Sequence, residues 1–337
     1  MHGAAVPLDR RGDPWFDDGN VILLTQTEDS SDDVAFKVHR GVLSRQSEIF
    51  RTMFEIPQLP SDVDILDDCP LVRMYDLPNE LSCLITALYD GATFHRRNIE
   101  DFFFLAAILR LSTKYFIGHL RTQAIRHLAQ TWPYSLRGHD EMVALALSSP
   151  TVNDMSYPYV HPLHVLNLAR EVNVRLIVPA ALYFLSIYAL EDILKADHPK
   201  LLVQHPSRPS SVLSVQDMKD YTLMYQHRMK MIMSFARHTV ASWSASSGCQ
   251  GTRKDCTRAV VRLAGCIYSS FTPRTGLFHN MSQTIDLIGD DKTICTACER
   301  AFRRDVAELR EKFWKELPSV VGLPSWEELE AMDLSPQ

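Results

Sequence analysis

The sequence lacks the features by which several broad classes of protein are recognised. Its 35 basic and 41 acidic residues give a formal net charge of −6, and it contains no run of four consecutive Lys or Arg residues. Such a chain has no general attraction for phosphate polyanions, so direct binding to nucleic acid is not expected. The most apolar segment, 102–109, is far shorter than the roughly 20 residues that cross a bilayer, so we expect no membrane span.

The beginning of the chain has no apolar run of the kind found in secretory signals. The first 18 residues instead contain prolines and several acidic residues. The seven cysteines are an odd number, and in a chain without an export signal such residues are more often thiols or metal ligands than disulfides. We therefore expect a protein of the cytoplasm or the nucleus.

Local motifs for common catalytic chemistry are also missing. The sequence contains none of the patterns typical of phosphate transfer, hydride transfer, acyl transfer or zinc proteolysis. Adjacent carboxylates do occur in polar, turn-like segments, at Asp17/Asp18, Asp32/Asp33, Asp67/Asp68 and Asp290/Asp291. Solvated turns account for such pairs better than acid–base catalysis does. We predict no catalytic residue and no enzyme.

What is present is the composition of a folded globular protein. Hydrophobic residues make up 46% and charged residues 23% of the 337 residues, a length that exceeds one ordinary domain of roughly 100–200 residues. The sequence predicts four parts: a flexible tail at 1–16, an α+β domain at 17–130, a helical region at 131–245 and a cysteine-containing helical C-terminal region at 246–337.

The predicted α+β domain begins with strands. The apolar run 21–25 and the alternating run 34–38 are expected to pair, and 71–75 supplies another strand. From His39 onward apolar residues fall at helical spacing, which predicts two short helices with Ser44 and Ser47 as caps. Further helices are predicted at 78–89, ending at Gly91, and over 102–128 with a break at Gly118. This pattern predicts a small sheet covered by short helices.

Beyond Trp132 the strand pattern disappears and the chain is predicted to be mainly α-helical. Apolar residues recur every three to four positions in the segments 142–147, 165–172, 176–190, 218–243 and 301–314. Prolines separate these segments. The segment 206–214, rich in Ser and Pro, is predicted to be a mobile loop.

One stretch of the predicted domain resembles a known family. The residues Phe36 to Phe54 resemble the signature of BTB/POZ domains, carried by Phe36, His39, Leu43, Ser47, Phe50 and Phe54. The resemblance covers about residues 17–130 and implies that these side chains are core and scaffold, with His39 in a structural role. It also implies a surface that binds other proteins. The domain followed by a long helical extension and a cysteine-bearing tail is similar to a group of mushroom-type fungal BTB proteins.

Two departures from the family bear on its partners. Many members begin the first strand with an aspartate that helps to pair subunits, whereas this chain has Asn20 there, so a homodimer is left open but in doubt. Cullin-binding members resemble one another in a hydrophobic-x-Glu motif after the Phe50–Phe54 helix. The loop 55–62 lacks that motif in its usual place, which weakens the expectation of a cullin scaffold as partner and leaves it open.

The C-terminal cysteines suggest a metal site. Cys295 and Cys298 form a C-x-x-C pair directly before a predicted helix, and Cys249 and Cys256 lie in a Gly/Ser/Arg-rich stretch. These four thiols are candidate ligands of a structural zinc ion that would tie the last long helix to the preceding helices. His238 or His279 is an alternative fourth ligand. Unliganded thiols and a redox pair are the competing interpretations.

These observations favour a non-enzymatic adaptor that binds other proteins. One form of this hypothesis is the recruitment of substrates to a cullin-type ubiquitin ligase, and another is a transcriptional co-regulator that acts through protein partners. A nucleic-acid-associated protein with a structural zinc site is the third alternative. Basic and acidic residues are interleaved over 299–316, which is typical of a solvated helix and counts against the third alternative.

Overall fold

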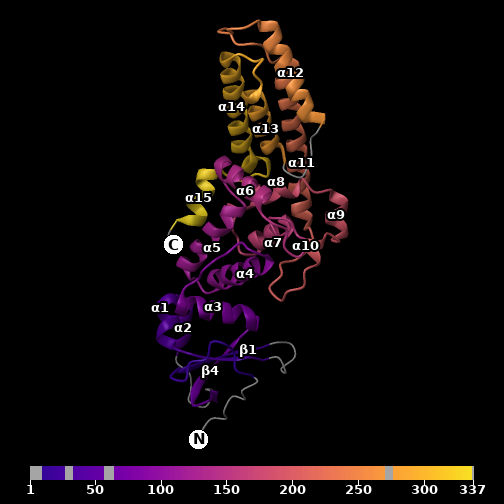
Figure 1. Ribbon diagram of the computed structural model, residues 1–337. Helices are drawn as coiled ribbons and strands as arrows, with labels where there is room; N and C mark the ends of the chain where they lie inside the picture. The colour runs from indigo at the N-terminus through magenta and orange to yellow at the C-terminus, as the bar shows by residue number, and fades with distance from the viewer. Residues whose placement is uncertain (1–9, 27–32, 57–63, 270–275, 336–337) are drawn as a thin grey trace. The chain divides into compact units, whose positions relative to one another are not determined.

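The structure of the chain divides into two compact units. The computed structural model describes residues 10–26, 33–56, 64–269 and 276–335 (Figure 1). Unit 1 comprises Met1–Leu128, Val203–Pro209 and Leu334–Gln337, and unit 2 comprises Ala129–Leu202 and Ser210–Asp333. The predicted fold class is confirmed: an α+β domain with a small sheet is followed by a mainly helical region.

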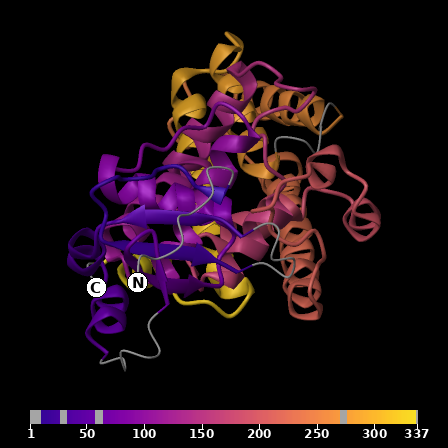
Figure 2. The ribbon, with the colours of Figure 1, turned by 90° about the horizontal axis from the view of Figure 1, so that it is seen from below.

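The described part of unit 1 contains a small sheet of four strands in the order β2-β1-β4-β3. Its strands, which lie side by side in Figure 2, are β1 (Val21–Thr25), β2 (Ala35–Val38), β3 (Ile65–Leu66) and β4 (Cys69–Met74). β1 is antiparallel to β2, as its sequence predicts, and parallel to β4. Ile22 and Leu23 point to opposite faces and both are fully buried, which explains why β1 is a continuous apolar run.

Helices lie on one side of this sheet, with α3 between the strands and α4 (Figure 1). They are α1 (Arg40–Gln46), α2 (Glu48–Glu55), α3 (Pro78–Asp90), α4 (Ile99–Lys114) and α5 (Gly118–Thr131). Ser47 caps α2 as predicted, whereas Ser44 lies inside α1. Gly91 ends α3 with a φ of +84°, a conformation that residues with a Cβ rarely adopt. The predicted break at Gly118 is confirmed, because α5 begins there.

The segment 10–16, which the sequence assigns to a flexible tail, pairs with the sheet. The N–H of Gly12 donates to the carbonyl of Ala35 at 2.8 Å, and the N–H of Phe16 donates to that of Lys37 at 3.0 Å. Trp15 packs against the core cluster around Ile22. Residues 1–9 lie outside the described residues.

A distant segment, Val203–Pro209, completes unit 1. Ser207 is 1% exposed. Its Oγ accepts a hydrogen bond from the Asn79 side chain at 2.8 Å, and its carbonyl accepts one from the Arg110 guanidinium, also at 2.8 Å. Arg110 also pairs with the buried Glu80 at 2.7 Å, and the ring of His205 stacks on that of Phe103 at 4.1 Å. The predicted mobile loop therefore has fixed partners over this part of its length.

Unit 2 is built from helices. They are α6 (Leu136–Ser148), α7 (Pro162–Glu171), α8 (Val178–Leu185), α9 (Leu190–Lys195), α10 (Pro199–Leu202), α11 (Val215–Ala236), the π-helix η3 (Arg237–Ser242), α12 (Arg253–Ser269), α13 (Gly276–Asp290), α14 (Thr296–Val320) and α15 (Trp326–Leu334). The apolar stretch 176–190, expected as one helix, is divided, because α8 ends at Leu185 and α9 starts at Leu190. The serine hydroxyl of Ser186 donates to the carbonyl of Tyr183 at this end.

Aromatic rings fill the centre of unit 2. The fully buried imidazole of His139 lies among the rings of Phe184, Phe278 and Trp314, with centroid separations of 5.7, 5.5 and 5.3 Å. Burial lowers the pKa of His139, so this ring is neutral near pH 7. Trp314 in turn stacks on Trp326 of α15 at 5.7 Å. The last two helices are thus tied to the core through aromatic contacts.

His161 combines burial with a helix-capping role. It is 1% exposed, and its Nδ1 accepts the backbone N–H of Leu163 at the start of α7 at 3.1 Å. Burial first, and then the charges of the neighbouring His198, His164 and Lys200, together lower the pKa of His161 to about 2. The imidazole must stay unprotonated to accept this hydrogen bond.

Acidification is therefore expected to destabilise unit 2 through His161. The unfolded chain binds a proton on this residue below pH about 6.5, while the folded chain does not, so its contribution is complete above that pH and is lost progressively below it. At pH 5 the loss is about 2 kcal/mol. The variant His161→Asn keeps a capping acceptor but cannot titrate. Thermal unfolding at pH 7 and pH 5 should show a smaller decline in this variant, and an equal decline would contradict the assignment.

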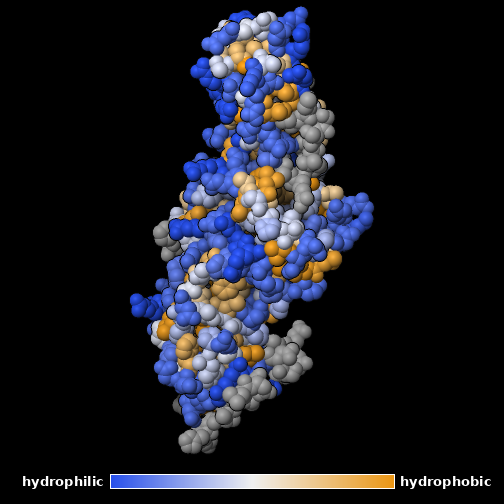
Figure 3. All heavy atoms as spheres, viewed as in Figure 1, coloured by the Kyte–Doolittle hydropathy of each residue, from blue (hydrophilic) through white to orange (hydrophobic). Residues whose placement is uncertain are grey.

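No helix within the described ranges has both the length and the apolar character needed to cross a membrane. On the face shown in Figure 3, hydrophilic residues dominate and hydrophobic residues form separate small patches.

Candidate functional site

Three of the motif residues of unit 1 belong to its buried core. Phe36 of β2, Leu43 of α1 and Phe50 of α2 are each at most 1% exposed. Large apolar side chains from three successive elements are thus buried in this unit. Their arrangement gives these three residues a packing role.

His39 joins the end of β2 to the end of α3. The hydroxyl of Tyr89 accepts the backbone N–H of His39 at 2.9 Å and lies 2.9 Å from its Nδ1. The Nε2 atom is 3.2 Å from the Asp18 carboxylate, and the ring of Phe16 lies 4.2 Å from that of Tyr89. Both ring nitrogens of His39 therefore have partners within unit 1, which fits a structural role.

Ser47 and Phe50 connect α2 to the end of α4. The Ser47 hydroxyl accepts the N–H of Phe50 at 3.1 Å and donates to the carbonyl of Tyr115 at 2.6 Å. The Phe50 ring stacks on Tyr115 at 4.5 Å. Burial raises the pKa of Tyr115, and its hydroxyl donates to the buried carboxylate of Asp76. Phe54 is half-buried, and the Arg40 guanidinium lies over its ring, 5.1 Å from the centroid of that ring.

The same part of unit 1 exposes four large apolar side chains, which we call the apolar edge: Ile56 (59% exposed), Tyr75 (77%), Leu77 (40%) and Phe116 (65%). Asp76, between Tyr75 and Leu77, binds both Lys114, at 2.6 Å, and Tyr115, which directly precede Phe116. Ile56 follows α2, which packs on Tyr115 through Phe50. The sequence did not reveal this surface, because no pattern distinguishes the exposed Phe116 from the buried Tyr115.

The two sequence departures have different outcomes. Asn20, which stands where many relatives have a subunit-pairing aspartate, is used within the domain, because its Oδ1 accepts the N–H of Arg40 at 2.8 Å. The loop 55–62, in which the cullin-associated motif is missing, lies outside the described residues from position 57 to its end. The apolar edge is therefore the described feature that bears on partners.

The four predicted metal ligands come together in unit 2. The sulfur atoms of Cys249, Cys256, Cys295 and Cys298 all lie within 4.8 Å of one another. The Cys249 sulfur is 3.8 Å from that of Cys256 and 3.7 Å from that of Cys295. A tetrahedral zinc ion with bonds of about 2.3 Å requires sulfur–sulfur separations of about 3.8 Å. The four cysteines are free thiols, and neither His238 nor His279 belongs to this group.

Local structure explains why the thiols converge. Cys295 is the N-cap of α14, and Cys298 lies in the first turn of this helix. Cys256 lies in the first turn of α12, and Cys249 follows a turn closed by its own N–H and the carbonyl of Ser246. Backbone N–H groups of Cys298 and Gln250 lower the pKa of Cys295 to about 6, so a thiolate is favoured at this position. The four residues could therefore hold a metal ion.

Comparison with known proteins identifies unit 1. Residues 21–128 match the family model of the BTB/POZ domain. No curated protein and no solved structure matches the chain. The matched range contains all six motif residues and the apolar edge. BTB/POZ domains are typically non-enzymatic modules that mediate protein–protein interaction and oligomerisation.

Proposed function

We propose that the chain is a non-enzymatic adaptor that binds one protein through unit 1 and another through unit 2. The ground for this proposal is that residues 21–128 form a BTB/POZ domain. The observation that supports this proposal is the apolar edge. Large apolar side chains that gather on an exposed surface commonly mark a protein interface. The buried motif residues beside it are used for packing, whereas the apolar edge is exposed and available to a partner.

Substrate recruitment to a cullin-type ubiquitin ligase is the specific form of the adaptor function that we favour. The apolar edge lies at the end of α2, beside the turn between α4 and α5, where it presents aromatic and aliphatic side chains to a partner helix. A transcriptional co-regulator would use the same edge for a different partner. We place either activity in the cytoplasm or nucleus. The order of domain, helical extension and cysteines supports a place among the mushroom-type fungal BTB proteins.

The double variant Tyr75→Ser/Phe116→Asn tests the adaptor function. Phe116 has a φ of +49°, which Asn tolerates, so the substitution removes apolar surface without adding backbone strain. We expect that a cullin scaffold co-purifies with the tagged wild-type chain from its native cell extract. The double variant should recover at least about tenfold less of it, as a loss of about 1.4 kcal/mol in binding predicts.

Ile65→Ser is the matched control, because Ile65 is an exposed apolar residue of unit 1 that pairs with the opposite end of β4. This control should retain its partners. Recovery of transcriptional regulators without a cullin would support the co-regulator. Equal recovery of all partners by the double variant and the wild type would contradict the role of the apolar edge.

We also propose that the four cysteines of unit 2 hold a structural zinc ion. The sulfur separations of 3.7 and 3.8 Å support this assignment, as does the position of two thiols at the start of α14, where the helix dipole favours negative charge. All four positions would be filled by protein ligands, which is the arrangement of a structural rather than a catalytic site. Elemental analysis of the purified chain should find about one zinc ion per chain.

The surroundings of the cysteines argue against a nucleic-acid interface. Along α14, Arg303 pairs with Glu299 at 3.3 Å, and Arg304 lies within 4.0 Å of both Asp305 and Glu308. Such mixed charges neutralise one another and leave no basic stripe for a phosphate backbone. The protein-adaptor function therefore accounts better for this region than the nucleic-acid alternative.

A further inference from the structure

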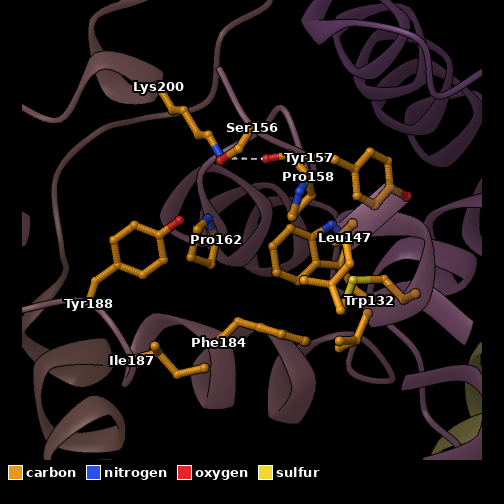
Figure 4. A pocket seen from close by; sticks show the side chains of 13 residues that line it. Trp132, Leu147, Ser156, Tyr157, Pro158, Pro162, Phe184, Ile187, Tyr188 and Lys200 are labelled. Carbon is orange, nitrogen blue, oxygen red and sulfur yellow. Dashed lines mark hydrogen bonds between the residues drawn. The ribbon is translucent and has the colours of Figure 1, made fainter. Parts of the chain in front are cut away.

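An apolar cavity of about 310 Å³ opens in unit 2 (Figure 4). Its walls come from α6, from the segment 156–162, from α8 and the residues after it, and from α10. Its apolar lining includes Trp132, Leu147, Tyr157 and Phe184. A cavity of this size takes one bulky aliphatic or aromatic side chain together with part of its backbone.

A second hollow of about 430 Å³ adjoins the first. The two share Ser156, Ile187, Tyr188 and Lys200 as lining residues. The second hollow has a different character, because its lining also includes Asp154, Asp192 and His198. A single extended ligand can therefore lie across both, with an apolar group at one end and a polar group at the other.

The charge at the polar end is negative. Asp154 and Asp192 are both exposed and are the acidic side chains that line this hollow. Burial and the charge of Lys200 lower the pKa of His198, which leaves its ring neutral. The ammonium group of Lys200 points to the carbonyl of Pro158 and donates to it at 2.6 Å (Figure 4). Two carboxylates therefore outnumber the one ammonium group around this hollow.

Aromatic side chains favour the same kind of ligand. The ring of Tyr188 lies between the hollows and packs against His161 at 4.5 Å and His198 at 5.4 Å. The face of such a ring attracts a cationic side chain, especially beside carboxylates.

From these features we infer that unit 2 binds a short peptide segment of a partner protein, with a bulky apolar side chain in the cavity and a neighbouring Lys or Arg between Asp154 and Asp192. The inference rests on the proposed adaptor function and names the ligand class of its second binding site. A peptide fits better than a small apolar molecule, because the second hollow adds charged groups that such a molecule would leave unused.

Selection of a displayed library of short random peptides on the full-length chain tests this site. We expect enriched peptides to contain a large apolar residue followed closely by Lys or Arg. In fluorescence anisotropy with dye-labelled copies of these peptides, Ala146→Phe should lower the affinity at least about tenfold, because residue 146 lines the cavity. The control Ala144→Phe changes an exposed position on the same helix and should bind like the wild type.

Charge reversal tests the polar end. The double variant Asp154→Lys/Asp192→Lys should lower the affinity for the same peptides at least about tenfold at low salt. The control is Glu191→Lys, which changes an exposed residue of α9 that does not line the hollow and should change the affinity little. The Tyr75→Ser/Phe116→Asn chain should still bind the peptides, since it alters only unit 1. If this chain loses partner capture but still binds the peptides, the loss is assigned to the apolar edge of unit 1 and not to the peptide site of unit 2.

Three results of the peptide experiments would overturn the inference. They are the absence of any enriched peptide, enriched peptides without a basic residue, and equal affinity for the wild type and Ala146→Phe. Binding of an apolar dye in the cavity without peptide binding would assign the site to small molecules instead, which also overturns it.

Discussion

Removal of zinc by a strong chelator is expected to lower the Tm of unit 2 by roughly 10 °C or more. An ion at about 1,000 times its dissociation constant stabilises the folded form by about 4 kcal/mol. In a unit of this size each kcal/mol corresponds to roughly 2–4 °C. The effect is large because the four thiols join the start of α12 to the start of α14, and these ends have no other covalent or metal link among the described residues.

The substitution Cys298→Ser should have the same effect without a chelator. Cys298 is fully buried, so the substitution places a buried hydroxyl at the position where a metal–thiolate bond is expected. Cys83→Ser is the matched control, because Cys83 is a free, half-buried thiol of unit 1 outside the group. Differential scanning calorimetry with and without chelator measures the shift. A chelator-independent Tm in the wild type, or equal behaviour of the two variants, would contradict the zinc assignment.

The substitution Phe50→Ala is expected to destabilise unit 1 by about 3–5 kcal/mol. Phe50 is fully buried and stacks on both Tyr115 and Phe54, so its removal leaves a cavity between α2 and the end of α4. The corresponding fall in Tm is roughly 10–20 °C. Circular dichroism during heating measures it, and the variant should also lose the partners of the apolar edge because that surface depends on α2.

Phe116→Asn is the companion control for this stability effect. The removed side chain is 65% exposed and the new residue accepts the positive φ, so the change in unfolding free energy should stay within about 0.5 kcal/mol. If Phe50→Ala were as stable as Phe116→Asn, the packing role assigned to the motif phenylalanine would be wrong.

The sequence predicted those parts of the fold that depend on local pattern. The pairing of 21–25 with 34–38 follows from two apolar runs close together in the sequence, and Gly91 ends a helix because it can adopt a positive φ. The convergence of the four cysteines was suggested by the C-x-x-C pair at the start of a helix. The strand and helix predictions depend on residues that are neighbours in the sequence. The metal-site prediction depends on cysteine, a residue type that is rare in this chain and is a common zinc ligand.

The surfaces proposed for binding were beyond the reach of sequence patterns. Phe116 and Tyr115 are adjacent aromatic residues, and only the tertiary structure shows that one stacks on Phe50 while the other is exposed. The cavity collects Trp132, Leu147 and Phe184 from separate elements, and each of them would be an ordinary core residue in a helical pattern. The empty space between side chains has no signature in the order of residues.

The insertion of Val203–Pro209 into unit 1 has a consequence for how the protein is made. A ribosome that has released residues 1–128 has delivered the sheet and its helices, but not the carbonyl and hydroxyl of Ser207 that bind Arg110 and Asn79. At about 5–20 residues per second this partner segment follows after a delay on the order of ten seconds. During that interval Arg110 and Asn79 lack these contacts, so completion of unit 1 is linked to synthesis of the first half of unit 2.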